Sequence, residues 1–264
     1  MSAGDRIKLA VLTRRWTWFG ELVLRLLAER GVEPDLIGVE TTTLHARMRL
    51  ARGLARHIGW IDAARYNVGF WWPVMRRRLG LDRRTAFPYA NYGKRVIETE
   101  DINAPRIAQG IVERGIDRVL LAHSGIIRQR ALLTPDIWVI NAHPGALPRM
   151  RGVDVVRWSI LEGVEPAVTV HRVDGGVDTG PILCRARVPP LPTEPLCAFE
   201  KRVNETAAHM LVQCGLAGRE AFPRPERQEG QHGRQYHLMP FKRFPEVVER
   251  FEAMKQQQRY NVEA

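Results

Sequence analysis

The stretch that decides the fold is Ile137-Trp138-Val139-Ile140-Asn141-Ala142-His143-Pro144-Gly145-Ala146-Leu147-Pro148-Arg149-Met150-Arg151-Gly152. Its apolar start, 137–140, is typical of a buried strand, and polar and turn-forming residues follow at once. Residues 167–181 repeat this order, with an apolar run before a glycine-rich loop. Ligands of open α/β sheets bind at the carboxyl ends of strands. We therefore expect both segments to deliver polar side chains to one site.

Three of these polar side chains form a chemically coherent set, namely Asn141, His143 and Asp178. The amide of Asn141 can donate to an oxyanion without titrating. The imidazole of His143 can move a proton, and a carboxylate nearby raises the pKa of an imidazole. Together, these groups could hold an oxyanion, move a proton and fix a tautomer, so we take Asn141, His143 and Asp178 as candidate catalytic residues.

Each residue also has a simpler explanation when it is taken alone. Asn141 and Asp178 could cap or close a turn, and His143 could be a buried structural histidine. The three together, in order, favour the catalytic interpretation. His171 and His123 remain open between a structural role and a place in the site wall.

The order of apolar runs along the chain predicts an α/β protein with a doubly wound, mostly parallel sheet. The predicted strands are 7–13, 35–40, 117–122, 137–141 and 167–170, and the predicted helices are 18–30, 103–114, 153–162, 193–218 and 245–257. Asn103 is the expected N-cap of the second helix. We expect a catalytic domain over 1–220, a helical insertion at about 41–99 and a C-terminal extension over 221–264.

Composition narrows the class of protein. The 264 residues carry a formal net charge of +11, which favours anionic partners but also fits a basic, solvated surface. No run of about 18 apolar residues predicts a membrane span, and the first residues do not resemble a signal peptide. Three cysteines without metal-ligand spacing, Cys184, Cys197 and Cys214, indicate reduced thiols and a cytoplasmic protein.

The motifs resemble the catalytic core of the folate-dependent formyltransferases. That family includes the glycinamide ribonucleotide, methionyl-tRNA and amino-sugar formyltransferases, and its pattern is Asn-x-His-Pro, Leu-Pro-x-x-Arg-Gly and then Asp-x-Gly. The matching residues are Asn141, His143, Leu147-Pro148, Arg151-Gly152 and Asp178-Thr179-Gly180. The resemblance is clear over roughly 119–190 and weak on either side.

The resemblance implies a Rossmann-like core and N10-formyltetrahydrofolate as the formyl donor, without a metal. It also implies a pterin pocket, formed by an irregular loop with apolar walls and by a glycine turn that lets the backbone approach closely. The residues expected to bind the donor are Ser124, Gly125, Ile126, Ile127, Gly175 and Gly176. The alternative role of these residues is ordinary packing and turn formation.

The acceptor is less well defined. Residues 12–18 do not form the glycine-rich phosphate loop of the glycinamide ribonucleotide enzymes, although Arg14 and Arg15 could bind an anion through their side chains. The segment after 218 is shorter than the C-terminal domain of the methionyl-tRNA enzymes. We therefore expect the partner to be a small amine, preferably a nucleotide-linked amino sugar. We expect neither nucleic acid nor a membrane as partner. The sequence leaves open whether the protein forms a homodimer. Trp71 or Trp72 could stack on a base, or could simply pack the insertion.

Other functions remain open. The acceptor could be an amine of secondary metabolism or an amino acid, or water could replace the amine in formyltetrahydrofolate hydrolysis. A folate- or nucleic-acid-binding protein on a decayed formyltransferase fold is the non-enzymatic alternative. A pure binding protein would have no use for the proton chemistry of Asn141, His143 and Asp178.

Overall fold

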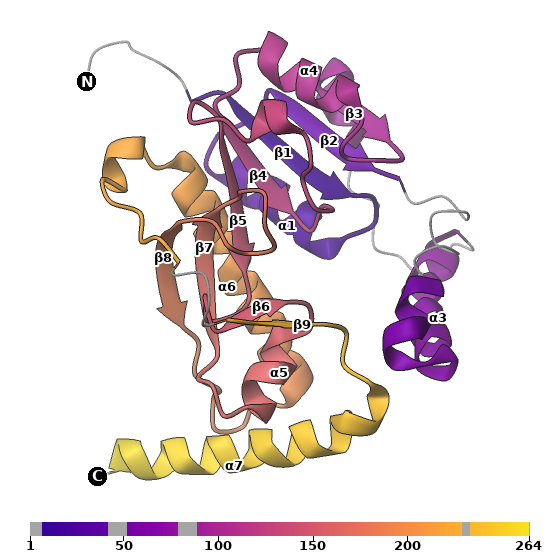
Figure 1. Ribbon diagram of the computed structural model, residues 1–264, viewed down its shortest axis with the longest axis vertical. Coiled ribbons are helices and arrows are strands. Elements are labelled where there is room, and N and C mark those ends of the chain that lie inside the picture. Colours follow the sequence, from indigo (N-terminus) through magenta and orange to yellow (C-terminus); the bar gives the residue numbers. More distant parts are fainter. Residues whose placement is uncertain (1–6, 42–51, 79–88, 229–232, 264) are drawn as a thin grey trace.

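The computed structural model describes residues 7–41, 52–78, 89–228 and 233–263. Within these residues, seven strands form one sheet in the order β3-β2-β1-β4-β5-β7-β8 (Figure 1). The strands are β1 (Leu9–Arg14), β2 (Leu36–Glu40), β3 (Val96–Thr99), β4 (Arg118–Ala122), β5 (Trp138–His143), β7 (Ala167–Arg172) and β8 (Ile182–Arg187). This confirms the predicted α/β class and the mostly parallel sheet.

The first five strands of the sheet are parallel, and the last two are not. β7 pairs antiparallel with β5, and β8 pairs antiparallel with β7. Since parallel strands were expected, the geometry of the second polar segment differs from the prediction. The carboxyl end of β7 does not lie beside that of β5; instead, residues inside β7 lie opposite the end of β5, and His171 pairs with Asn141. Strand β8 was not predicted.

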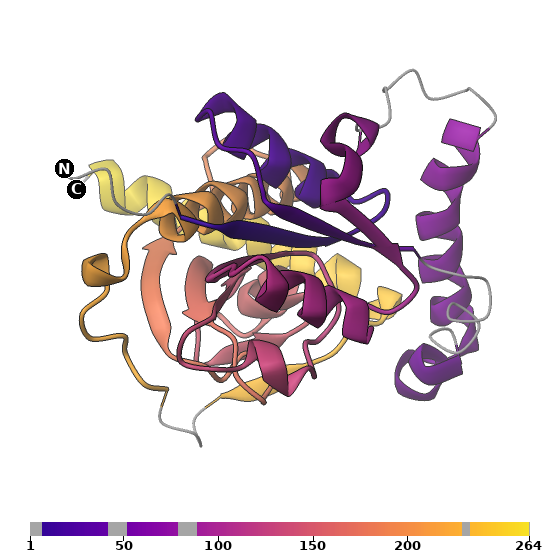
Figure 2. The ribbon, with the colours of Figure 1, turned by 90° about the horizontal axis from the view of Figure 1, so that it is seen from above.

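Helices cover both faces of the sheet (Figure 2). Because side chains alternate along a strand, Leu9 and Val11 of β1 enter one buried cluster, and Ala10 and Leu12 enter the other. Helices α1 and α6 cover the first cluster, and α4 covers the second. The helices are α1 (Trp18–Glu29), α4 (Pro105–Glu113), α5 (Val155–Leu161) and α6 (Leu196–Leu216).

The helix starts show one correct and one wrong expectation. Helix α1 begins near the predicted residue, and Thr17 caps it by accepting a hydrogen bond from the Gly20 amide. Asn103 is not the N-cap of α4, because Ala104 takes that position and no side chain caps the helix. The amide of Asn103 bonds to the loop after β4 instead.

The segment predicted as an insertion is largely helical where the structure describes it. Residues 52–58 are helical, α3 spans Trp60–Arg78, and a 3-10 helix spans Tyr89–Arg95. Its last four residues are strand β3, which extends the sheet beyond β2. Tyr66 ties α3 to the rest of the protein, since its hydroxyl donates to Asp154 or to the Met239 carbonyl, with oxygen–oxygen distances of 3.0 and 2.8 Å.

The C-terminal residues pack closely on the preceding domain. β9 (Arg234–Tyr236) pairs with β6 (Met150–Gly152), directly after the motif that follows β5. Helix α7 (Phe244–Glu263) packs against α5 and buries Phe251. The Phe251 ring lies 5.1 Å from that of Phe199 on α6. Residues far apart in the sequence therefore share one core.

This packing predicts that α7 contributes strongly to stability. Phe251 and Phe199 are both fully buried, so Phe251→Ala should lower the free energy of unfolding by about 3–5 kcal/mol, through lost transfer energy and a cavity. Val248, on the same helix, is 47% exposed, and Val248→Ala should change stability by less than about 0.5 kcal/mol. Denaturant unfolding of both variants checks this; equal effects would show that α7 is not part of the cooperative core.

Candidate active site

Asn141 and His143 lie two residues apart near the end of β5, so their side chains project from the same face of the strand. The antiparallel partner β7 places His171 opposite Asn141 and Thr169 opposite His143. Asn141 Nδ2 lies 3.2 Å from His171 Nε2. His143 and His171 are 3% and 2% exposed, so both imidazoles are almost completely removed from water.

Asp178 reaches this pair from the loop between β7 and β8. Its Oδ2 accepts a hydrogen bond of 2.9 Å from the Gly152 amide and lies 3.5 Å from His143 Nδ1. Its Oδ1 lies 3.5 Å from His171 Nε2. The structure therefore brings together Asn141, His143 and Asp178, and it adds His171, which the sequence had left open.

The loop that carries Asp178 is shaped by its own contacts. Asp174 accepts hydrogen bonds from the Gly176 amide and from the Thr179 hydroxyl. At Gly180 a Cβ atom would lie 1.9 Å from the Arg172 carbonyl oxygen, so only glycine fits. Gln228 donates to the carbonyls of Asp178 and Gly180. These contacts hold the Asp178 carboxylate in place.

The electrostatics of Asp178 favour its ionised form. Burial raises the pKa of the carboxyl, but the neighbouring imidazoles of His171 and His143 and the hydrogen bond from the Gly152 amide together lower the pKa to about 2. Asp178 is therefore ionised near neutral pH.

The electrostatics of His143 differ from the expectation. We expected the carboxylate to raise the pKa of this imidazole, but burial outweighs Asp178 and lowers the pKa. Nε2 of His143 lies 2.7 Å from the Met150 carbonyl oxygen and donates to it. The imidazole is therefore neutral near pH 7, with Nδ1 facing Asp178. A proton added at Nδ1 forms an ion pair with this carboxylate.

Thr169 is a supporting residue that the sequence analysis missed. It is completely buried, its hydroxyl donates to the Gly145 carbonyl, and it accepts a hydrogen bond from the Leu147 amide. These bonds fix the turn that follows His143. A polar residue within the apolar run 167–170 was the available signal.

These groups face a cavity of about 690 Å³. One wall is apolar and contains Ile126, Ile127, Val173 and Val177. Ser124, Gly125 and Gly176 also line the cavity, whereas Gly175 is exposed and does not. A flat heterocycle suits such a wall, because the side chains are apolar and the irregular backbone offers donors and acceptors.

Other lining residues come from distant parts of the chain: Arg14, Thr17 and His123 beside α1, Val155, Val156 and Arg157 of α5, Glu200 and Asn204 of α6, and Gln235, Tyr236 and His237 of the C-terminal segment. None of these, apart from Arg14 and His123, was considered for the site from the sequence. Their contribution depends on how the chain folds back on itself.

His123 lies in a strained position at the edge of this cavity. Its φ of 58° is in the left-handed region that non-glycine residues rarely adopt. Its ring stacks on Phe19, with the centroids 4.1 Å apart. Burial, together with the charge of Arg14, lowers its pKa to about 4, so the ring is neutral and serves as part of the wall.

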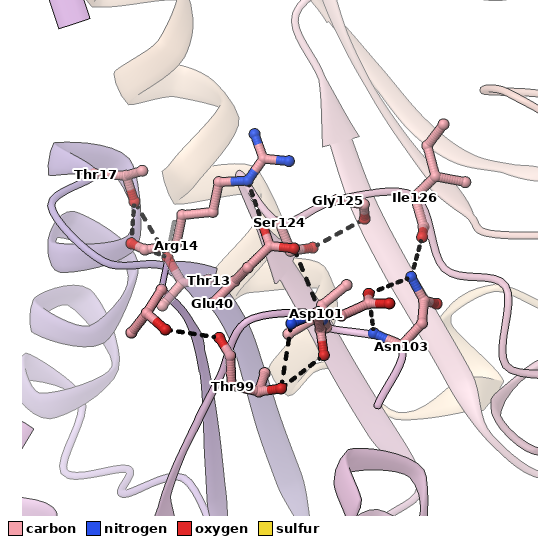
Figure 3. A network of polar contacts seen from close by, with 12 residues as sticks. Thr13, Arg14, Thr17, Glu40, Thr99, Asp101, Asn103, Ser124, Gly125 and Ile126 are labelled. Atoms are coloured by element: carbon pink, nitrogen blue, oxygen red, sulfur yellow. Dashed lines mark hydrogen bonds and ion pairs between the residues drawn. The ribbon is translucent and has the colours of Figure 1, made fainter. Parts of the chain in front are cut away.

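The two arginines of the cavity differ in their partners. Arg157 is paired with Glu200 through two contacts of 2.5 and 3.1 Å. Arg14 donates from Nε to Glu40 at 2.5 Å, and its side chain is 44% exposed (Figure 3). The charge of Arg157 is therefore largely neutralised by Glu200, whereas Arg14 presents its outer nitrogens at the cavity.

Several groups considered from the sequence cannot be assigned. The side chains of Trp71, Trp72 and Arg76–Arg78 lie outside the described residues. Among the described residues, no group of three or more His, Cys, Asp or Glu side chains could hold a metal ion. Within the same residues, every helix is too short or too polar to cross a membrane.

Part of the chain is similar to proteins of a known family. Residues 84–214 match the family model described as formyl transferase. The methionyl-tRNA formyltransferase of Thermus thermophilus is 33% identical over 115 residues, which make up 43% of this chain and 38% of the relative. The chain thus matches less than half of that protein.

Solved structures show the same fold. An N-formyltransferase from Helicobacter canadensis, determined with folinic acid and dTDP-3-aminofucose, aligns with a TM-score of 0.54 and 16% identity, over 95% of this chain and 79% of that one. Phosphoribosylglycinamide formyltransferase from Streptococcus pneumoniae aligns with a TM-score of 0.51 and 20% identity, over 79% and 98%. The mostly parallel sheet with helices on both faces is the Rossmann-like fold of these enzymes. Through residues 84–214, the chain belongs to the formyl transferase family.

Proposed function

We propose that this protein transfers a formyl group from N10-formyltetrahydrofolate to the amine of a small acceptor. The observation that carries the proposal is the convergence of Asn141, His143 and Asp178 on one cavity, with Asp178 within 3.5 Å of His143 Nδ1. Family membership supports the reaction class. The volume of the cavity is within the usual range for sites that hold small ligands.

The chemistry follows from the positions of these groups. An acceptor amine attacks the formyl carbon, a new carbon–nitrogen bond forms, and negative charge builds on the formyl oxygen. The Asn141 amide has two N–H groups; one lies toward His171, and the other can donate to this oxygen. The carbon–nitrogen bond to the folate then breaks.

The proton from the attacking amine must be accepted and passed to the leaving nitrogen. His143 is neutral before the reaction, because burial lowers its pKa, so it can accept this proton directly or through a water. Asp178 stabilises the imidazolium that results. The imidazolium then returns the proton, and the leaving nitrogen departs without a charge.

For the acceptor, we propose a small amine that carries an anionic group, with a nucleotide-linked amino sugar as the preferred class. In the loop after β1, two main-chain amides are not available to a phosphate, because the Arg15 amide donates to the Glu40 carbonyl and the Thr17 amide to the Arg14 carbonyl. An anion at this end of the cavity would therefore meet the Arg14 side chain. Enzymes of this fold act on different acceptors, as the names of the two solved structures indicate.

An amine without a nucleotide is the second candidate. The charged residues that line the cavity are Arg14 and Arg157 against Asp154, Asp178 and Glu200, so the cavity lining is not basic even though the whole protein is. This balance suits a neutral or cationic amine of secondary metabolism. The acceptor must therefore be decided by experiment.

The first prediction concerns the proton acceptor. His143→Ala should lower kcat by about 10²–10⁴-fold while folate affinity changes little, because the proton is handled only in the transition state. His209→Ala is a suitable control, since His209 is exposed on α6. Steady-state kinetics with formyltetrahydrofolate and a reactive amine measure both; parental activity in His143→Ala would contradict the assignment.

The second prediction concerns pH. Neutral His143 is the active form, so activity should be lost as the pH falls through its pKa, which lies below the ordinary value. Asp178 raises this pKa; Asp178→Asn should therefore move the acid limb to lower pH and also reduce kcat. Both enzymes are compared with the same acceptor, so the titration of the acceptor cancels. Asp174→Asn controls for loop structure; an unchanged rate and profile for Asp178→Asn would reduce Asp178 to a turn residue.

The third prediction concerns the acceptor. In a panel of amino-sugar nucleotides, free amines, glycinamide ribonucleotide and methionyl-tRNA, an amino-sugar nucleotide should give the highest kcat/KM. Its KM should rise with salt and in Arg14→Ala, because an anion–guanidinium contact is screened by ions. Arg25→Ala, an exposed arginine on α1, should have no effect. If a free amine reacts best and Arg14→Ala does not alter its KM, the anionic-acceptor proposal fails while formyl transfer stands.

A further inference from the structure

Asn103 makes contacts that its place in the sequence does not explain. It lies just before α4, yet its side chain bonds to the loop after β4 (Figure 3). Nδ2 donates to the Ile126 carbonyl at 2.9 Å, and Oδ1 accepts from the Arg128 amide at 2.6 Å. The main-chain carbonyl of Asn103 also accepts a hydrogen bond from Gln129 Nε2. One residue thus bonds to three residues of this loop, Ile126, Arg128 and Gln129.

The loop needs such a partner, because residues 124–129 have no regular secondary structure. The carbonyl of Ile126 and the amide of Arg128 flank Ile127, whose side chain is buried in the core beside α4. A carboxamide has the same donor and acceptor as a peptide group. Asn103 therefore acts as a neighbouring strand would, pairing with both main-chain groups and fixing the direction of Ile126 and Ile127.

Asn103 is itself held by the turn that leaves β3. Asp101 Oδ1 accepts from the Asn103 amide at 2.8 Å and from Nδ2 at 3.2 Å. The Thr99 hydroxyl, at the end of β3, donates to the Asp101 carbonyl at 2.8 Å. The side chain of Asn103 is therefore oriented before any ligand binds, and the loop is tied to the edge of the sheet.

We propose that Asn103 is a positioning residue that sets the affinity of the site for folate, by holding the loop 124–128 as a preformed wall. This rests on the proposed function, in which that wall contacts the pterin. Ser124, Gly125, Ile126 and Ile127 line the cavity, whereas Asn103 does not. Asn103 touches neither His143 nor Asp178, so its loss should weaken donor binding and leave the chemical step nearly intact.

The test compares Asn103→Ala with the parent and with Asn67→Ala. Asn67 is a matched control, because, within the described part of the chain, its side chain bonds to the Ala63 carbonyl of its own helix. Titration with folinic acid gives Kd, steady-state kinetics give KM for the donor and kcat, and hydrogen exchange follows the Arg128 amide. We expect Asn103→Ala to raise Kd and donor KM by about 10-fold, to keep kcat within about 3-fold, and to expose the Arg128 amide to exchange. Asn67→Ala should match the parent.

The outcomes separate this proposal from the function on which it rests. An unchanged Kd in Asn103→Ala, or a loss confined to kcat, overturns the positioning role. Should Asn103→Ala not fold, Asn103→Asp, which keeps the acceptor and loses the donor, replaces it with the same expected direction. If the parent itself does not bind folinic acid, the proposed function fails, and the affinity role of Asn103 fails with it. Exchange at the Arg128 amide then shows separately whether Asn103 holds the loop.

Discussion

The ionised carboxylate of Asp178, partly buried between two histidines, is the constraint on which the candidate site depends. It accepts a hydrogen bond from Gly152 and lies 3.5 Å from both His143 and His171. A carboxylate that is removed from water is costly without such partners. The same contacts connect His143 at the end of β5, His171 in β7 and Gly152 at the end of β6. The fold around Asp178 holds these strands and its two histidines together.

The antiparallel pairing of β5 with β7 makes this arrangement possible. In a parallel pair, the Asp178 loop would leave from the same edge of the sheet as the loop after His143. Here β7 runs back along β5 and places His171 opposite Asn141. The chain then turns at Gly180, where no side chain fits, and Asp178 is directed toward the two imidazoles.

The rest of the cavity is assembled from segments that have little in common in the sequence. The apolar side comes from the loop after β4 and from the Asp178 loop, and the other sides come from the segment between β1 and α1, from α5 and α6, and from β9 with the residue that follows it. The excess of positive charge in the protein is not concentrated there, since two arginines face three acidic residues among the lining side chains. The basic composition therefore says little about what this cavity binds.

The α/β class, the mostly parallel sheet and most helices could be predicted from the sequence. Their signal is the spacing of apolar residues, which is a local property and differs between strands and helices. Strands β3, β6, β8 and β9 could not, because β3, β6 and β9 have only three or four residues and β8 lacks a fully apolar run. The motif residues Asn141, His143 and Asp178 could be named because their order along the chain is distinctive.

By itself, the sequence determined which residues we propose for the chemistry and which family the chain resembles, since motif and periodicity are local properties. Only the tertiary structure decided the direction of β7, the place of His171, the neutral state of His143 and the use of Asn103 as a partner for a distant loop. Each of these depends on burial or on contacts between residues far apart in the chain. For His143, the sequence showed the carboxylate that raises the pKa but not the burial that lowers it more.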